Sequence, residues 1–178
     1  MKLKKKLWIL LDLVGICALV ALDQYTKYLA VIHLKDKKPN NNINIINGVL
    51  ELNYLENTGA AFGVLENQKA FFIFVAVVVL SVIGYVLLKT PDHKKYGILH
   101  ISLSLIAAGA IGNMIDRIRL NYVVDFIYFS LINFPIFNVA DMYVTVSTAV
   151  LMILLLFVYK ESDLNFISFK QKRYRELK

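Results

Sequence analysis

Four long apolar segments constrain this chain more than any other feature of its sequence. They lie at about 7–27, 70–88, 97–115 and 140–159, and the second contains no charged residue. A helix of about 20 residues crosses a hydrocarbon core of about 30 Å. The pattern therefore predicts an all-α membrane protein with four transmembrane helices.

The composition agrees with this class. Hydrophobic residues make up 58% of the 178 residues, whereas average protein composition is about 45–50% apolar. Once four spans are subtracted, no remaining segment is long enough to fold as a separate soluble domain. We therefore expect a single membrane domain that comprises residues 1–178.

The distribution of Lys and Arg predicts the orientation of the spans. On one side of the predicted membrane, four lie before the first span, three lie between the second and third spans, and six lie in the basic tail 160–178. The other side, formed by the opposite ends of the spans and by the segments 28–69 and 116–139, holds only seven. Cytoplasmic loops carry the excess of basic residues. Both termini are therefore expected in the cytoplasm, with 28–69 and 116–139 outside. The net charge of +7 then needs no nucleic-acid partner, and the tail is expected to lie on anionic lipid headgroups.

The N-terminal segment also has some features of a cleaved signal peptide, because lysines precede an apolar run. Cys17, the only cysteine, could be taken for a lipid-modification site. Bulky Ile16 stands where a small residue is expected before a cleavage site. We therefore interpret this segment as the first span, and a lone cysteine excludes an internal disulfide.

The outer segment 28–69 contains one strand pattern. Residues 49–56 alternate apolar and polar side chains, which is the period of a half-buried strand. The asparagines at 40–42 precede it as a loop, and 57–59 follow it as a turn. We expect a small extracytoplasmic β-segment here, and Pro135 marks a break before the last span.

Polar residues gather at the outer ends of the first, third and fourth spans. Asp23 and Lys27 are one helical turn apart and can pair; the pair either closes the span at the interface or positions a substrate. Asp116 stands beside Arg117, and such neighbours usually form a structural salt bridge. Gly109 and Gly112 allow close approach between helices.

Two further aspartates could carry chemistry. Asp125 lies in an apolar run without an adjacent cation, and burial there would raise its pKa; it could also be an exposed or capping residue. Asn138 or Asp141 could cap the last span, but capping explains only one of them. Two aspartates in contact share a proton, so that one activates water and the other donates to a carbonyl.

Other catalytic arrangements have little support. The three histidines, His33, His93 and His100, are not at metal-ligand spacing, and no serine lies in a nucleophile elbow. A proton relay would place ionisable groups along the membrane depth, where Asp12 stands alone. A non-catalytic assembly protein remains an alternative. We expect neither a metal nor a cofactor.

Five motif blocks, in order, resemble those of the bacterial lipoprotein signal peptidases (signal peptidase II). The blocks are 23–27 (DQYTK), 57–63 (NTGAAFG), 109–117 (GAIGNMIDR), 123–126 (VVDF) and 137–141 (FNVAD). The resemblance covers nearly the whole chain. Asn121 and Ala108 stand where members of this family often have glycine, and Asn tolerates a left-handed backbone.

The resemblance implies a membrane aspartyl endopeptidase in which Asp125 and Asp141 form the catalytic dyad. It implies cleavage of diacylglyceryl-modified prolipoproteins on the N-terminal side of the lipidated cysteine, at the outer face of the bacterial cytoplasmic membrane. It also implies inhibition by globomycin, contact with membrane lipid and a monomeric enzyme. The residues that it implies line or support the site are Asp23, Lys27, Asn57, Gly59, Asn113, Arg117, Asn138 and Ala140.

Overall fold

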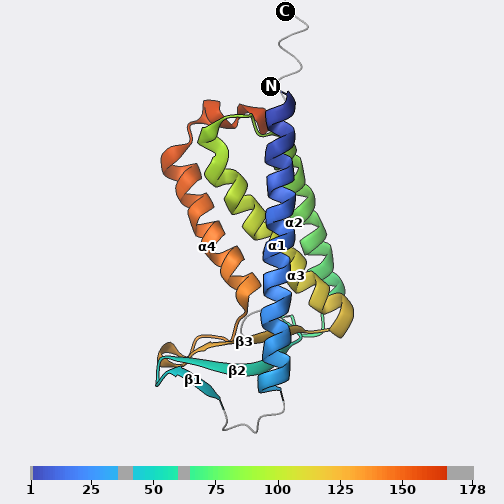
Figure 1. The fold of residues 1–178 in the computed structure, drawn as a ribbon, viewed down its shortest axis with the longest axis vertical. Helices are drawn as coiled ribbons and strands as arrows, with labels where there is room; N and C mark the ends of the chain where they lie inside the picture. Colours follow the sequence, from blue (N-terminus) through green and yellow to red (C-terminus); the bar gives the residue numbers. More distant parts are fainter. Residues whose placement is uncertain (1, 36–41, 60–64, 168–178) are drawn as a thin grey trace, which may run out of the picture.

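The computed structural model describes residues 2–35, 42–59 and 65–167. Long helices form a bundle, and a small sheet closes one end of it (Figure 1). Within the described residues, four helices are long and apolar enough to cross a membrane, as predicted. They are α1 (Lys2–Leu34), α2 (Lys69–Lys89), α3 (Gly97–Leu120) and α4 (Val139–Ile153), which a π-helical turn, η4 (Leu154–Val158), extends.

Two helices are longer than predicted. α1 continues to Leu34 instead of ending near residue 27, and α3 continues to Leu120 instead of ending near residue 115. The 33 residues of α1 span about 50 Å at 1.5 Å per residue, which exceeds the thickness of a bilayer core. The polar residues expected to end these spans are instead paired inside the bundle, so the helices carry on to the sheet.

The sheet has three antiparallel strands in the order β1-β2-β3. β2 (Leu50–Asn57) matches the predicted strand within one residue, but β1 (Ile43–Ile46) and β3 (Val123–Phe129) were not predicted. The first four residues of β3 are all buried, so this strand has none of the alternation that revealed β2. Its pairing with β2 aligns Asn57 with Val123 and Leu55 with Asp125.

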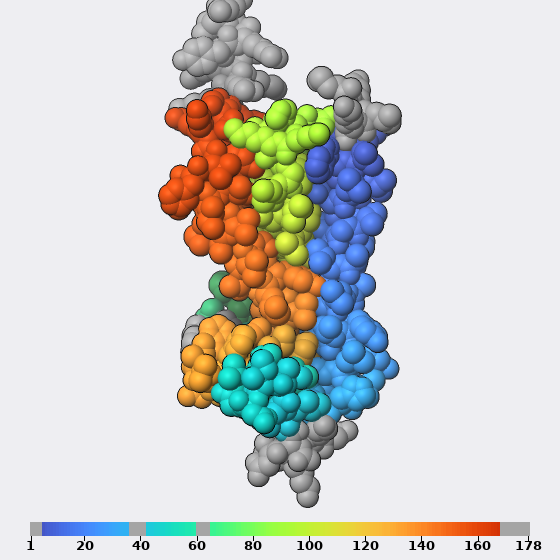
Figure 2. Space-filling view, turned by 60° about the vertical axis from the view of Figure 1, so that its left-hand side comes forward, coloured from blue at the N-terminus to red at the C-terminus, as the bar shows by residue number. Residues whose placement is uncertain are grey.

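The sheet packs against the C-terminal end of α1. A buried apolar cluster joins Ala30 and Leu34 of α1 to Val124 and Phe126 of β3. Figure 2 shows the segment with β1 and β2 (cyan) lying against the lower end of α1 (blue) and the segment that carries β3. This contact places β3 beside the start of α4.

Polar contacts fix the register between α1 and α3. Asp12 accepts hydrogen bonds from Ser104 (3.2 Å) and lies 2.7 Å from the ring of His100, while Lys27 bonds Asn113 (2.8 Å) near the other end. The partners are always 86 to 92 positions apart in sequence, so the two helices run parallel. The sequence suggested that Asp12 has no polar partner in the membrane, but α3 supplies two, His100 and Ser104.

Three predictions fall on segments outside the described residues. They are the predicted loop at 39–42 except for residue 42, the motif residues 60–63, and the part of the basic tail at 168–178. The described part of the tail contains a 3-10 helix, η5 (Glu161–Ile167).

Candidate active site

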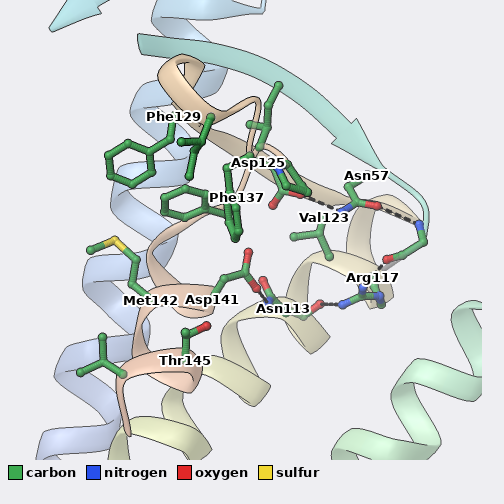
Figure 3. Close-up of a pocket in the computed structure, with 16 residues that line it drawn as sticks. Asn57, Asn113, Arg117, Val123, Asp125, Phe129, Phe137, Asp141, Met142 and Thr145 are labelled. Atoms are coloured by element: carbon green, nitrogen blue, oxygen red, sulfur yellow. Dashed lines mark hydrogen bonds between the residues drawn. The ribbon is translucent and has the colours of Figure 1, made fainter. Parts of the chain in front are cut away.

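Asp125 and Asp141 reach the same cavity from different elements. Asp125 lies in β3, and Asp141 lies in the first turn of α4. Both line a cavity of about 660 Å³, and Figure 3 shows their carboxylates pointing toward each other across it. The two aspartates thus meet at the sheet end of the bundle. Much of the remaining wall is apolar, with Phe129, Phe134, Ile136, Phe137, Met142 and Val146.

Amide groups hold all four carboxylate oxygens of the pair. The side chains of Asn57 (2.8 Å) and Asn138 (2.6 Å) donate to the two oxygens of Asp125. The side chain of Asn113 (2.8 Å) and the backbone N–H of Asn138 (3.1 Å) donate to those of Asp141. These bonds fix both carboxylates in orientation and favour their ionised forms.

Asn138 joins the two halves of the site. Its side chain accepts from the backbone N–H of Asp141 (3.0 Å), and with the reciprocal bond this forms a capping box for α4. The same side chain donates to Asp125 and, at 3.2 Å, to Asn113. Both Asn138 and Asp141 therefore belong to the cap, and capping does not exclude a second role for either residue.

Burial dominates the acidity of Asp125. Its side chain is 1% exposed, and removal from water raises its pKa to about 7, with the charge of Asp141 acting in the same direction. The hydrogen bonds from Asn57 and Asn138 and the charge of Lys27 oppose this rise. The direction agrees with the expectation from sequence that apolar surroundings favour the protonated carboxyl.

A buried ion cluster lies behind the aspartates. Lys27, only 3% exposed, contacts Asp23 at 3.0 Å and Asp116 at 2.9 Å and donates to Asn113 at 2.8 Å. The expected pairing of Asp23 with Lys27 is therefore present. The expected salt bridge between Asp116 and Arg117 is absent. The Arg117 side chain donates to the carbonyl of Gly59 instead, and Asp116 pairs with Lys27.

The same cluster ties together four elements. Asp23, which is fully buried, accepts from the backbone N–H of Ala140 at the start of α4 (2.9 Å). Asp116 of α3 accepts from the backbone N–H of Val124 in β3 (3.3 Å). Asp23, Lys27, Asn138 and Ala140 are not among the residues that line the cavity; they lie behind it and hold its walls.

Gln24 is a member of this cluster that sequence reasoning did not assign. Its amide donates to Asp116 (2.9 Å), to the carbonyl of Gly112 (3.2 Å) and to Asp23 (3.2 Å). Its position inside the block 23–27 was the only local signal. The bonds to α3 depend on a neighbouring helix and could not be inferred from that block.

Two glycines of α3 permit the close packing on which the cluster depends. A Cβ at Gly109 would lie 2.6 Å from the carbonyl oxygen of Ala140, and a Cβ at Gly112 would overlap the carboxylate of Asp23. The predicted role of Gly109 and Gly112 in close helix approach is consistent with this geometry. Asn121, which ends α3, has φ +70°, the left-handed conformation that Asn tolerates.

A second cavity of about 360 Å³ lies between α2, α3 and α4. It shares Asn113, Arg117, Asp141 and Thr145 with the first cavity. Its other walls are formed by apolar or small residues of the three helices. Asp141 is therefore accessible from two sides.

Arg117 lies where the two cavities adjoin. Its guanidinium donates to the carbonyl oxygen of Gly59 (2.9 Å) and sits 4.4 Å from the centre of the Phe72 ring. A longer bond of 3.4 Å joins it to the carbonyl of Asn113 on its own helix. Neither Phe72 nor Thr145 was singled out from the sequence, because both lie in apolar spans with no motif around them.

A buried and a partly buried aspartate, both held by amides at one end of four helices long enough to span a membrane, are the arrangement expected of an aspartic peptidase of the membrane. Residues 15–157 match the family model described as Signal peptidase (SPase) II. The chain belongs to the signal peptidase II family. Within the described ranges, no group of three acidic, His or Cys residues could hold a metal ion.

Similar proteins agree with this assignment. The "Lipoprotein signal peptidase" of Streptococcus thermophilus is 43% identical over 84% of this chain and 93% of its own length. The protein of the same name from Caldanaerobacter subterraneus is 44% identical over 82% and 95%. A bacterial membrane enzyme solved at 2.3 Å resolution has a TM-score of 0.73 and 31% identity, over 84% of this chain and 92% of that one.

Proposed function

We propose that Asp125 and Asp141 are the catalytic dyad with which this signal peptidase II removes the signal peptide from diacylglyceryl-modified prolipoproteins. One carboxylate takes a proton from water, and the water oxygen attacks the carbonyl carbon of the scissile peptide bond. The other carboxyl donates its proton to the carbonyl oxygen. Collapse of the tetrahedral intermediate breaks the C–N bond before the lipidated cysteine. The leaving amine takes the proton that the first carboxylate removed from water, and the second carboxylate recovers its proton from a hydroxyl of the intermediate.

The observation that carries this proposal is the set of four amide donors on the two carboxylates. Preorganised groups do not have to reorient when charge develops in a transition state. The pKa of Asp125, about 7, keeps a proton available to the pair near neutral pH. Both features suit a shared-proton dyad.

The two cavities suggest how the substrate lies. The second cavity is enclosed by apolar residues of the spanning helices and suits the membrane-embedded signal peptide. The first lies under the sheet and suits the lipidated cysteine, whose acyl chains stay among membrane lipids. The scissile bond would then cross at Asp141, Asn113 and Arg117, which both cavities share.

The remaining features belong to the same proposal. The sheet end faces the outside of the cytoplasmic membrane, with both chain termini in the cytoplasm, as the Lys and Arg distribution favours. Globomycin would inhibit by occupying the dyad cavity. We also propose that the enzyme acts as a monomer, because a single chain can supply every residue assigned to the site.

Cleavage of a diacylglyceryl prolipoprotein by purified enzyme in lipid, with and without globomycin, tests the dyad. Asp125→Asn and Asp141→Asn should each lower the rate by at least about a hundredfold, the range for loss of an acid–base group. Asp92→Asn, in the loop between α2 and α3, should cleave at the normal rate. Correctly folded dyad variants that retain the wild-type rate would overturn the proposal.

A further inference from the structure

The Arg117 side chain lines both the dyad cavity and the second cavity, and no other described residue that lines either of them is a cation. A guanidinium has five N–H donors, and the carbonyls of Gly59 and Asn113 take one each. The group can therefore still donate to a peptide carbonyl passing between the cavities. Whether the Arg117 guanidinium can bind such a carbonyl depends on its orientation, because a long side chain between two cavities can turn toward either of them.

Among the described residues, two hydrogen bonds and one ring contact of Arg117 bear on that direction. The bond to Asn113 is long, at 3.4 Å, and the bond to Gly59 fixes one nitrogen only. A single hydrogen bond leaves rotation about its axis free. The third contact is the face of the Phe72 ring, 4.4 Å from the guanidinium carbon, which is well inside the range of a cation–π interaction.

Phe72 differs from the other phenylalanines at the start of α2. Phe71 and Phe74 are 47% and 66% exposed, as expected for side chains that face lipid. Phe72 is half-buried, lines the second cavity and turns its ring to Arg117. The other residues of α2 that line this cavity, Val75, Ala76 and Val79, offer no aromatic face.

We propose that Phe72 is a positioning residue, whose ring holds the Arg117 guanidinium flat between the two cavities so that it meets the substrate peptide where the peptide crosses from one to the other. The inference rests on the proposed function, since it concerns the same bond cleavage. It gives α2, which carries no charged residue between its terminal lysines, a part in catalysis.

Steady-state cleavage of a diacylglyceryl prolipoprotein in lipid tests this role. Phe72→Leu should lower kcat roughly fivefold, the size expected from losing a partly buried cation–π contact, while KM changes by less than about twofold because the apolar cavity walls that hold the substrate remain. Phe72→Tyr keeps a ring face and should restore most of the rate. Phe74→Leu makes the same substitution on the exposed face and serves as the matched control.

A double-mutant cycle separates positioning from packing. In an Arg117→Gln background, Phe72→Leu should lower kcat no further, because the group that the ring positions is gone. The inference is wrong if Phe72→Leu retains the wild-type kcat, if it multiplies the defect of Arg117→Gln, or if Phe72→Tyr is as slow as Phe72→Leu. Failure of the wild-type enzyme to cleave would refute the proposed function instead, so the two failures can be told apart.

Discussion

Asp125 is subject to two opposing influences. Burial favours its protonated form, whereas the amides of Asn57 and Asn138 favour the carboxylate. Burial has the larger effect, so its pKa in the folded protein is about 7 instead of the ordinary 3.8. An enzyme that shares a proton between two carboxyls needs this balance, because a fully ionised pair could not donate to the substrate.

This balance predicts a pH dependence of stability. The folded protein holds the Asp125 proton more tightly than the unfolded chain does, so its contribution is complete below about pH 4 and is lost as the pH rises toward about 7. The thermal unfolding temperature in detergent should therefore fall more steeply between about pH 4 and pH 7 for the wild type than for Asp125→Asn, which cannot titrate. Parallel slopes for the two proteins would contradict the raised pKa.

At the scale of helices, the site depends on how closely α3 approaches its neighbours. Gly112 faces the carboxylate of Asp23, and Gly109 faces the backbone of Ala140. Asp23 in turn holds the start of α4 through the N–H of Ala140. A side chain at either glycine would push apart the helices that carry the ion cluster.

Gly112→Ala should accordingly destabilise the protein by about 1–3 kcal/mol, the usual effect of overpacking, because its Cβ would displace the buried Asp23 carboxylate. Gly84→Ala is the matched control. A Cβ at Gly84, in the middle of α2, meets no atom within 4 Å, and alanine favours a helix by up to about 1 kcal/mol over glycine. The unfolding temperatures in detergent test the pair; equal stability of the two variants would rule out the close approach at Gly112.

Among the elements, the four spans were predicted from the sequence most accurately and the sheet least accurately. The spans are recognisable because each is a local run of apolar residues. β3 is hidden because Val123, Val124, Asp125 and Phe126 are buried on both faces and show no period of two. Two of the three partners of Lys27, Asp116 and Asn113, come from α3, so its sequence neighbours could indicate only Asp23.

At the scale of the whole molecule, the two ends of the helix bundle differ both in structure and in charge. The sheet and the dyad lie at one end of the bundle, and the start of α1 lies at the other (Figure 1). The lysines at the start of α1 and those between α2 and α3 lie at the end away from the sheet. By the positive-inside rule, this arrangement supports the proposed location of the dyad outside the cytoplasm.

Cysteine labelling of intact cells tests this orientation. In a Cys17→Ser background, Asn47→Cys in the turn between β1 and β2 should react with a membrane-impermeant maleimide. Lys94→Cys between α2 and α3 should react only after the cells are permeabilised. Both positions are exposed, so access to the reagent is the only difference expected. The reverse labelling pattern would invert the proposed topology.

Sequence alone determined the membrane class, the four spans and the residue types of the site, because hydropathy, length and motif order are properties of short segments. The tertiary structure decided which of those residues face the cavity and which lie behind it. It also decided the sheet, the role of Gln24 in the ion cluster and the contact of Phe72 with Arg117. The physical reason is that these interactions join residues far apart in the chain, such as Asp23 with Ala140, and only the packing of the helices brings them within hydrogen-bonding or van der Waals range.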